Sequence, residues 1–77
     1  MVKPTRVTNS IRALRFTHGE MTQAQLAERV GVTRQTVIAI EQGRYSPSLE
    51  LAFQIARVFQ VPLDEVFQYP GMERETS

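Results

Sequence analysis

The chain has 77 residues, a formal net charge of +1 and no cysteine. This length favours one domain with a small core, and the lack of cysteine excludes disulfides and thiolate metal sites. Residues 1–44 carry seven basic and three acidic side chains, whereas residues 45–77 carry two basic and five acidic ones. The basic half favours a polyanionic partner, although such asymmetry also arises by chance in a short chain.

No apolar run approaches the roughly 20 residues that a membrane span needs. The first eight residues contain two basic side chains without an apolar stretch behind them, which is not the pattern of a secretory signal. We therefore expect a cytoplasmic protein with no membrane partner.

Glycine and proline divide the chain into five segments whose apolar residues have helical spacing. The predicted helices cover residues 9–17, 23–30, 34–42, 49–59 and 63–67. Asn9 or Ser10 is expected to cap the first helix, and Thr22, Thr33 and Ser48 the next three. Gln25 completes a capping box with Thr22, and Gly43 is expected to end the third helix in the left-handed conformation. The segments 6–8 and 67–69 are rich in β-branched and aromatic residues, so they either pair as a short sheet or fray.

The second and third predicted helices are joined by Val30-Gly31-Val32-Thr33, a tight turn with a central glycine. This is the helix-turn-helix arrangement, in which the second helix of the pair lies in the major groove of DNA. Helical hairpins also occur in proteins that do not bind DNA, so the faces of the third helix must be considered as well.

On a helical wheel, Val37, Ile40 and the stem of Glu41 point inward. The outward side carries Arg34, Gln35, Ile38, Ala39 and Gln42. Arginine suits the acceptors of guanine, glutamine suits adenine, and small apolar side chains suit the thymine methyl group. The alternative is an ordinary polar surface with two exposed apolar residues.

Phosphate contacts are predicted at both ends of this helical pair. Gln23 lies in the first turn of the second helix, where free N–H groups favour an anion. Arg44, Tyr45 and Ser46 follow the third helix and offer charge and hydroxyl groups to phosphates. A simple preference for helix starts is the alternative for Gln23, and packing on the domain is the alternative for Tyr45.

Between about residues 11 and 68 the chain resembles the Cro/CI family of repressors, also called the Xre type. The matching stretches are IRALR, MTQAQLAERVGVTRQTVIAIEQGRYSPSLELAFQIARVF and VPLDEVF. The resemblance implies an all-α, compact five-helix fold like that of lambda repressor, with a small two-stranded sheet from the chain ends in short members. It divides the chain into an arm or strand at 1–8, a Cro/CI-type domain at 9–67 and a tail or strand at 68–77.

The resemblance also implies residue roles. The family's base-contacting positions fall on Thr33, Arg34, Gln35, Ile38 and Ala39, and its phosphate-contacting positions fall on Gln23, Arg44 and Tyr45. It implies a structural ion pair between Arg15 and Glu41, with direct DNA contact by Arg15 as the alternative. Glu20 departs from the family pattern as an extra residue between the first two helices, and Pro62 replaces the usual hydroxyl cap of the fifth.

An enzyme is not expected, because nothing in the sequence meets the minimum for a catalytic site. His18 is the single histidine, and the adjacent Asp64 and Glu65 diverge on a helix. No cofactor, metal or small-molecule effector is therefore predicted.

We expect a sequence-specific repressor that binds double-stranded DNA as a homodimer on a palindromic operator. The candidate dimer interface consists of apolar residues near the end of the chain, Leu63, Val66, Phe67 and Tyr69, with Phe53 of the fourth predicted helix as a further candidate. The alternative is an antitoxin or protein-bridging module that uses the same fold.

Overall fold

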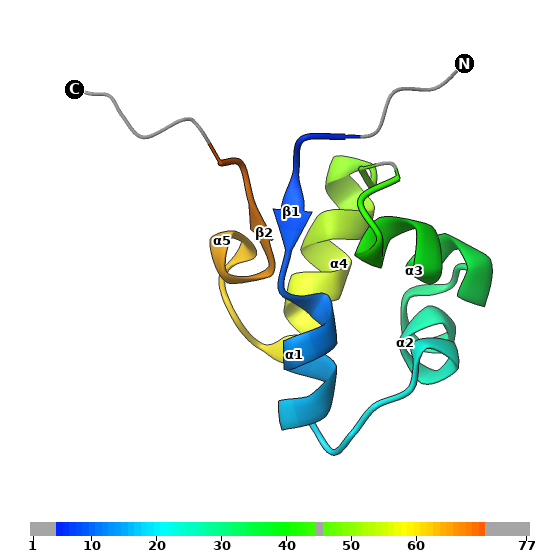
Figure 1. Cartoon of the computed structure of the whole chain (residues 1–77). Helices are drawn as coiled ribbons and strands as arrows, with labels where there is room; N and C mark the ends of the chain where they lie inside the picture. The colour runs from blue at the N-terminus through cyan, green and yellow to red at the C-terminus, as the bar shows by residue number, and fades with distance from the viewer. Residues whose placement is uncertain (1–4, 45, 71–77) are drawn as a thin grey trace.

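The structure, a computed structural model, describes residues 5–44 and 46–70. Within these residues it contains five helices and two short strands (Figure 1). In chain order they are β1 (Thr8–Asn9), α1 (Ile11–Thr17), α2 (Gln23–Val30), α3 (Arg34–Glu41), α4 (Leu49–Phe59), α5 (Leu63–Val66) and β2 (Phe67–Gln68). The prediction of a five-helix domain with a small sheet is thus confirmed.

The predicted bounds of α2 and α4 are confirmed to the residue. The Thr22 hydroxyl accepts from the backbone N–H of Gln25 at 3.0 Å, and the Gln25 side chain accepts from the backbone N–H of Thr22 at 2.9 Å. This is the predicted capping box. The Ser48 hydroxyl accepts from the backbone N–H of Leu51 at 3.1 Å. Local sequence pairs therefore determine where these two helices begin.

α3 ends at Glu41, one residue earlier than predicted. Gly43 has a φ of +73°, its N–H donates to the Ile40 carbonyl at 3.0 Å, and the Arg44 N–H donates to the Ala39 carbonyl at 3.0 Å. These two bonds form the Schellman arrangement that glycine favours at helix ends. Gly43 therefore stops α3 in the left-handed conformation, as predicted.

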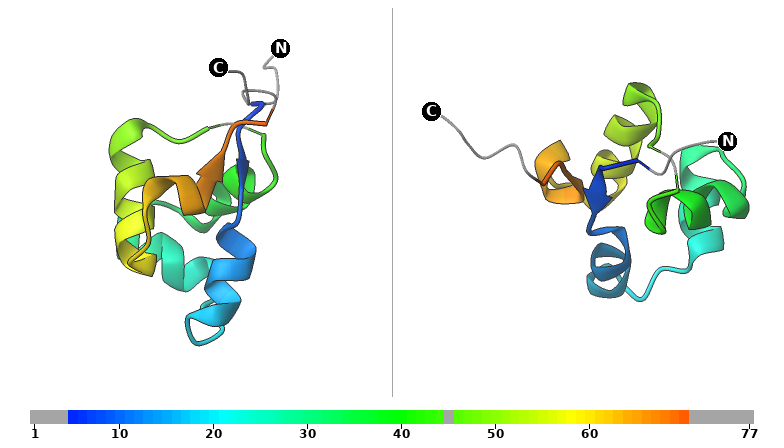
Figure 2. Two further views of the ribbon diagram at one scale, coloured as in Figure 1. Left: turned by 90° about the vertical axis from the view of Figure 1, so that its left-hand side faces the viewer. Right: turned by 45° about the horizontal axis from the view of Figure 1, so that its top comes forward.

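The predicted sheet of the chain ends exists, but its position differs from the prediction. β1 is Thr8–Asn9 rather than residues 6–8, and β2 is Phe67–Gln68 without Tyr69. The strands are antiparallel, with Thr8 opposite Gln68 and Asn9 opposite Phe67. α1 accordingly begins two residues later than predicted, and α5 ends one residue earlier, because Asn9 and Phe67 belong to the strands. Figure 2 shows β1 and β2 side by side next to α5.

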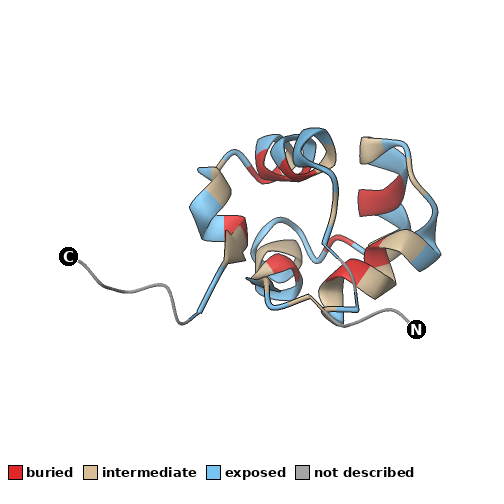
Figure 3. Cartoon of the chain, turned by 90° about the horizontal axis from the view of Figure 1, so that it is seen from above, coloured by how far each residue is buried: buried red, intermediate tan, exposed pale blue. Residues whose placement is uncertain are grey.

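The core is built from apolar residues of all five helices and of the loop before α2. Its buried members are Ile11, Met21, Leu26, Ala27, Val37, Ile40, Ile55, Ala56, Phe59 and Val66. Figure 3 shows that buried residues occupy the sides of the helices that face the middle of the molecule. None of the helices in the described parts of the chain has the length and apolar character of a membrane span.

Candidate DNA-binding interface

A three-residue turn joins α2 to α3. Gly31 has a φ of +77°, and both its N–H and that of Val32 donate to the Ala27 carbonyl, at 2.9 and 3.0 Å. An L side chain in this left-handed conformation costs about 1–2 kcal/mol, so glycine suits the position. Thr33 then starts α3, because its hydroxyl accepts from the backbone N–H of Thr36 at 3.2 Å. The turn thus sets the direction of α3 relative to α2.

α3 has one buried side and one open side. Val37 and Ile40 are 1% and 2% exposed and anchor the helix in the core. The predicted base-reading residues lie on the cap and the open side of this helix, with Thr33, Arg34 and Gln35 exposed and Ile38 and Ala39 half-buried. The helical wheel places Ile38 and Ala39 on the outward side, whereas in the structure both are half-buried. The exposed arginine and glutamine lie at the start of α3, where helices of this arrangement contact base edges.

An ion pair joins α1 to the end of α3. Arg15 Nε lies 2.7 Å from Glu41 Oε2, and Arg15 Nη2 donates to Glu41 Oε1 at 3.2 Å. The two side chains are only 13% and 9% exposed. Arg15 Nη1 also donates to the Met21 carbonyl at 2.8 Å. Each of the three guanidinium nitrogens therefore donates within the protein, which favours a structural role for Arg15 over direct DNA contact.

Gln23 belongs to the same network. Its Nε2 donates to Glu41 Oε1 at 3.2 Å, and the side chain is half-buried. The carboxylate of Glu41 thus holds residues of α1 and α2 at once. One N–H of the Gln23 amide is therefore used within the protein.

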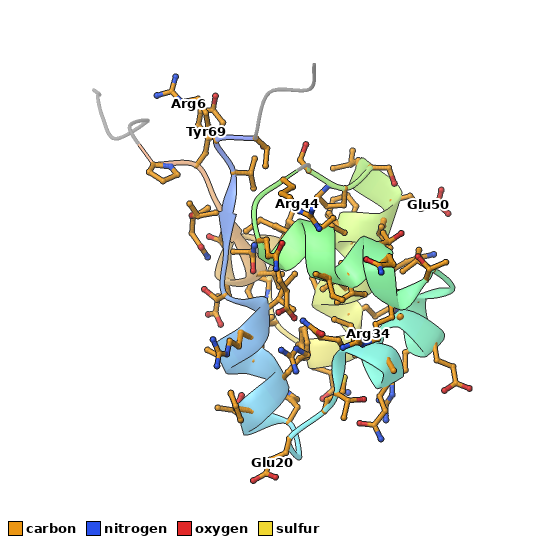
Figure 4. All side chains as sticks on the ribbon, turned by 45° about the vertical axis from the view of Figure 1, so that its right-hand side comes forward. Arg6, Glu20, Arg34, Arg44, Glu50 and Tyr69 are labelled. Atoms are coloured by element: carbon orange, nitrogen blue, oxygen red, sulfur yellow. The ribbon has the colours of Figure 1, made fainter. Side chains whose placement is uncertain are left out.

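The residues predicted to bind phosphate after α3 lie on a short exposed connection. Arg44 and Ser46 are both exposed, whereas Tyr45 lies outside the described residues. Figure 4 shows Arg34 and Arg44 over opposite ends of α3, with Glu20 at the far end of the α1–α2 loop. Two exposed guanidinium groups therefore flank the open side of α3.

Two residues that line a cleft beside α3 were not singled out from the sequence. A cleft bounded by α1, α2 and α3 is lined by Arg12 and Arg34 together with the Arg15–Glu41 pair. Arg12 adds an exposed positive charge from α1 to this face. Its neighbour Ile11 is buried, so helical periodicity places Arg12 toward solvent, but only the packing of α1 beside α3 brings it to the cleft.

Asn9 also lines the cleft. Its Nδ2 donates to the carbonyls of Ile40 and Glu41 at 2.9 and 3.4 Å, and its Oδ1 accepts from the backbone N–H of Ile11 at 3.1 Å. The sequence predicts Asn9 or Ser10 as the cap of the first helix, but Ser10 is the N-cap and makes no side-chain cap bond, while Asn9 accepts from Ile11 one residue earlier, as in an Asx turn. The contact with the Ile40 carbonyl spans 31 residues and could not be read from local pattern.

The candidate dimer-interface residues divide into two groups. Leu63 and Phe67 are half-buried, Tyr69 is 48% exposed, and the three line a shallow hollow with Val7. Val66 is completely buried in the protomer core, so its side chain has no surface to offer a partner. Three of these four residues, all except Val66, therefore have side-chain surface that a partner could contact.

The fold and the paired helices α2 and α3 define a helix-turn-helix protein. The sequence profile of the family described as Helix-turn-helix matches residues 11–66. The chain belongs to this family.

Several relatives of this chain are named as transcriptional regulators. The chain is 49% identical over 65 residues to an uncharacterised HTH-type transcriptional regulator of Methanocaldococcus jannaschii, covering 84% of this chain and 97% of that one. It is 49% identical over 59 residues to the uncharacterised HTH-type regulator YgzD of Bacillus subtilis, with 77% and 88% coverage. It is also 34% identical to the cryptic phage CTXphi transcriptional repressor RstR of Vibrio cholerae, over 77% of this chain and 52% of that one.

A solved structure supports the fold. A candidate DNA-binding protein from Bacteroides fragilis superposes with a TM-score of 0.70 at 21% identity, covering 80% of this chain and 98% of that one. The family and its named members point to a DNA-binding protein rather than an enzyme.

Proposed function

We propose that the protein is a sequence-specific transcriptional regulator that inserts α3 into the major groove of double-stranded DNA. The observation that carries the proposal is the exposure of Arg34 and Gln35 at the start of a helix whose other side is locked into the core. Both side chains match base edges, arginine with guanine O6 and N7 and glutamine with adenine N6 and N7. The relatives named as transcriptional regulators support this function.

Three further residues of α3 and its cap complete the proposed base-reading set. The Thr33 hydroxyl is engaged by the backbone N–H of Thr36 and by its hydroxyl, so Thr33 contacts DNA through its methyl group or its remaining lone pair. The exposed parts of Ile38 and Ala39 fit thymine methyl groups. Their half-burial fixes the side chains before DNA arrives, which lowers the entropy lost on binding.

Phosphate contacts position α3 in the groove. Arg44 and Ser46, together with Tyr45, contact the backbone beyond the C-terminal end of α3. Gln23 contacts it at the start of α2 through the second N–H of Nε2 or through backbone N–H groups, since Glu41 accepts from only one of the two N–H groups of this amide. The contacts therefore hold both ends of the helical pair against the DNA backbone.

The protein acts as a homodimeric repressor on a palindromic operator in the cytoplasm. Leu63, Phe67 and Tyr69 form the interface, which covers apolar surface that a small domain otherwise leaves in water. Two copies of α3 then enter successive major grooves, with half-sites about 10–10.5 base pairs apart. The likeness to the RstR repressor favours repression, and a dimer bound over a promoter blocks polymerase.

Selection of bound sequences from a random duplex library tests the DNA-binding proposal. The expected result is an enriched palindrome whose half-sites lose preference at one base step when Gln35 is replaced by alanine. Recovery of no enriched motif with the wild-type protein contradicts sequence-specific binding.

Sedimentation at micromolar concentration tests the dimer. Leu63→Glu should convert the dimer to monomer, because it places a charge in the apolar interface. Phe53→Glu is the matched control, since Phe53 is 53% exposed and lies with Leu49 on a separate apolar face of α4. Dissociation by Phe53→Glu alone would move the interface to α4, and a monomeric wild type would remove the dimer altogether.

A further inference from the structure

Asn9 joins three parts of the fold through a single residue. Its backbone lies in β1 and pairs with Phe67 of β2. Its Oδ1 accepts from the backbone N–H of Ile11 at the start of α1. Its Nδ2 donates to the carbonyls of Ile40 and Glu41 at the end of α3, at 2.9 and 3.4 Å. The side chain thus connects the recognition helix to the sheet.

The last carbonyl groups of a helix have no partners within the helix. Asn9 donates to two of these carbonyls from a different element, as a second donor to the Ile40 carbonyl beside the Gly43 N–H and as a more distant donor to the Glu41 carbonyl. The backbone next to it continues the connection, because the Ser10 N–H donates to the Val66 carbonyl at 2.8 Å. A path of hydrogen bonds therefore runs from the end of α3 through β1 to the end of α5 and the start of β2.

That path ends at the surface assigned above to self-association. Phe67 pairs directly with Asn9, and Leu63 and Tyr69 share a hollow with Phe67. In a symmetric dimer, the relative placement of α3 and this surface determines the distance and angle between the two recognition helices. A change in that placement is repeated in the second protomer by the two-fold axis.

We infer that Asn9 is a positioning residue that fixes α3 relative to the dimer interface and thereby selects the spacing between operator half-sites. This inference rests on the proposed homodimer. The Arg15–Glu41 pair ties α3 to α1 but does not reach β1 or β2, so Asn9 provides a connection that the ion pair does not. Removing the amide leaves α3 able to read a half-site but free to shift relative to its partner copy.

The test compares binding to a single half-site duplex with binding to palindromes whose half-site spacing changes by one base pair at a time. Each added base pair rotates one half-site about the DNA axis by about 34°. The wild type should favour one spacing over its neighbours by about tenfold or more, as for a mismatched site. Asn9→Ala should reduce that ratio about fivefold, the factor that one net hydrogen bond supplies, with half-site affinity within about twofold of wild type.

Asn9→Asp keeps the oxygen that accepts from Ile11 and replaces the donor to α3 with a carboxylate oxygen, which repels the carbonyls of Ile40 and Glu41. It should relax the spacing preference as Asn9→Ala does. Thr8→Ala is the matched control from the same strand, since the exposed Thr8 hydroxyl contacts only the Gln68 carbonyl, at 3.5 Å, in the described structure. It should keep the wild-type spacing preference. Urea unfolding of each variant reports any loss of stability separately.

Retention of the wild-type spacing preference by both Asn9 variants overturns the inference and leaves the dimer intact. Equal losses on the half-site and on all palindromes also overturn it, because they indicate direct DNA contact or a general loss of the fold. A wild-type protein with no spacing preference overturns the proposed dimer and the role of Asn9 with it. The three results are distinguishable from one binding series.

Discussion

The Arg15 guanidinium holds the Glu41 carboxylate through two N–H groups, at 2.7 and 3.2 Å, and so links α1 to the last residue of α3. Both side chains are nearly buried, and Gln23 donates to the same carboxylate. This carboxylate of α3 thus accepts from two other elements, α1 and α2, and joins the three helices. Loss of the Glu41 carboxylate should change the angle of α3 relative to α1 and α2 more than it changes the exposed side chains of α3.

Replacing Arg15 with methionine should lower the free energy of unfolding by about 3–5 kcal/mol, because it leaves the Glu41 charge without its main partner. Urea unfolding followed by circular dichroism measures the change. Arg57→Met on α4 is the control, since Arg57 is exposed and such surface changes stay within about 0.5 kcal/mol. Equal effects of the two substitutions would show that the ion pair does not brace the fold.

A domain of this size has only about 5 kcal/mol of stability, so Arg15→Met alone could leave too little folded protein to measure. The double variant Arg15→Met with Glu41→Leu removes both charges and should be more stable than Arg15→Met, because no unpaired carboxylate remains. Its unfolding midpoint should lie above that of the single variant. A midpoint at or below it contradicts the unpaired-charge explanation.

Gln35→Ala should cost about 1–3 kcal/mol of binding free energy on the selected operator. The cost should disappear on random DNA, because a base contact contributes nothing to sequence-independent binding. Titration of both duplexes at one salt concentration measures the difference. Gln54→Ala on the exposed side of α4 is the matched control and should change neither. Equal losses on both duplexes would remove Gln35 from the base-reading set.

Arg44→Ala should weaken binding to specific and random DNA alike, because a phosphate contact carries no sequence information. The slope of log K against log salt should become shallower by about 0.9 for the one contact removed. Binding measured at four or more salt concentrations gives the slope. Arg57→Ala removes the same charge from α4 and should leave the slope unchanged. A slope that falls equally in both variants would indicate a general charge effect.

The parts of the fold that the sequence predicts are those with local causes. Thr22 with Gln25, Ser48 and Gly43 determine helix ends within a few residues of themselves. The predicted positions of β1 and β2 differ from the observed ones, because the pairing of these strands depends on contacts between residues about 60 positions apart. The contact of Asn9 with α3 and the capture of the Gln23 amide by Glu41 were missed for the same reason.

The left-handed conformation of Gly31, in the turn between α2 and α3, can be tested by its effect on stability. Gly31→Ala should lower stability by about 1–2 kcal/mol, because φ is +77° and alanine is strained there. No atom lies within 4 Å of the added Cβ, so the cost comes from the backbone and not from a clash. Gly31→Asn should cost less, because asparagine tolerates the left-handed conformation better than alanine. Thermal unfolding of the two variants measures the order, and equal losses would mean that the left-handed conformation is not what selects glycine at this turn.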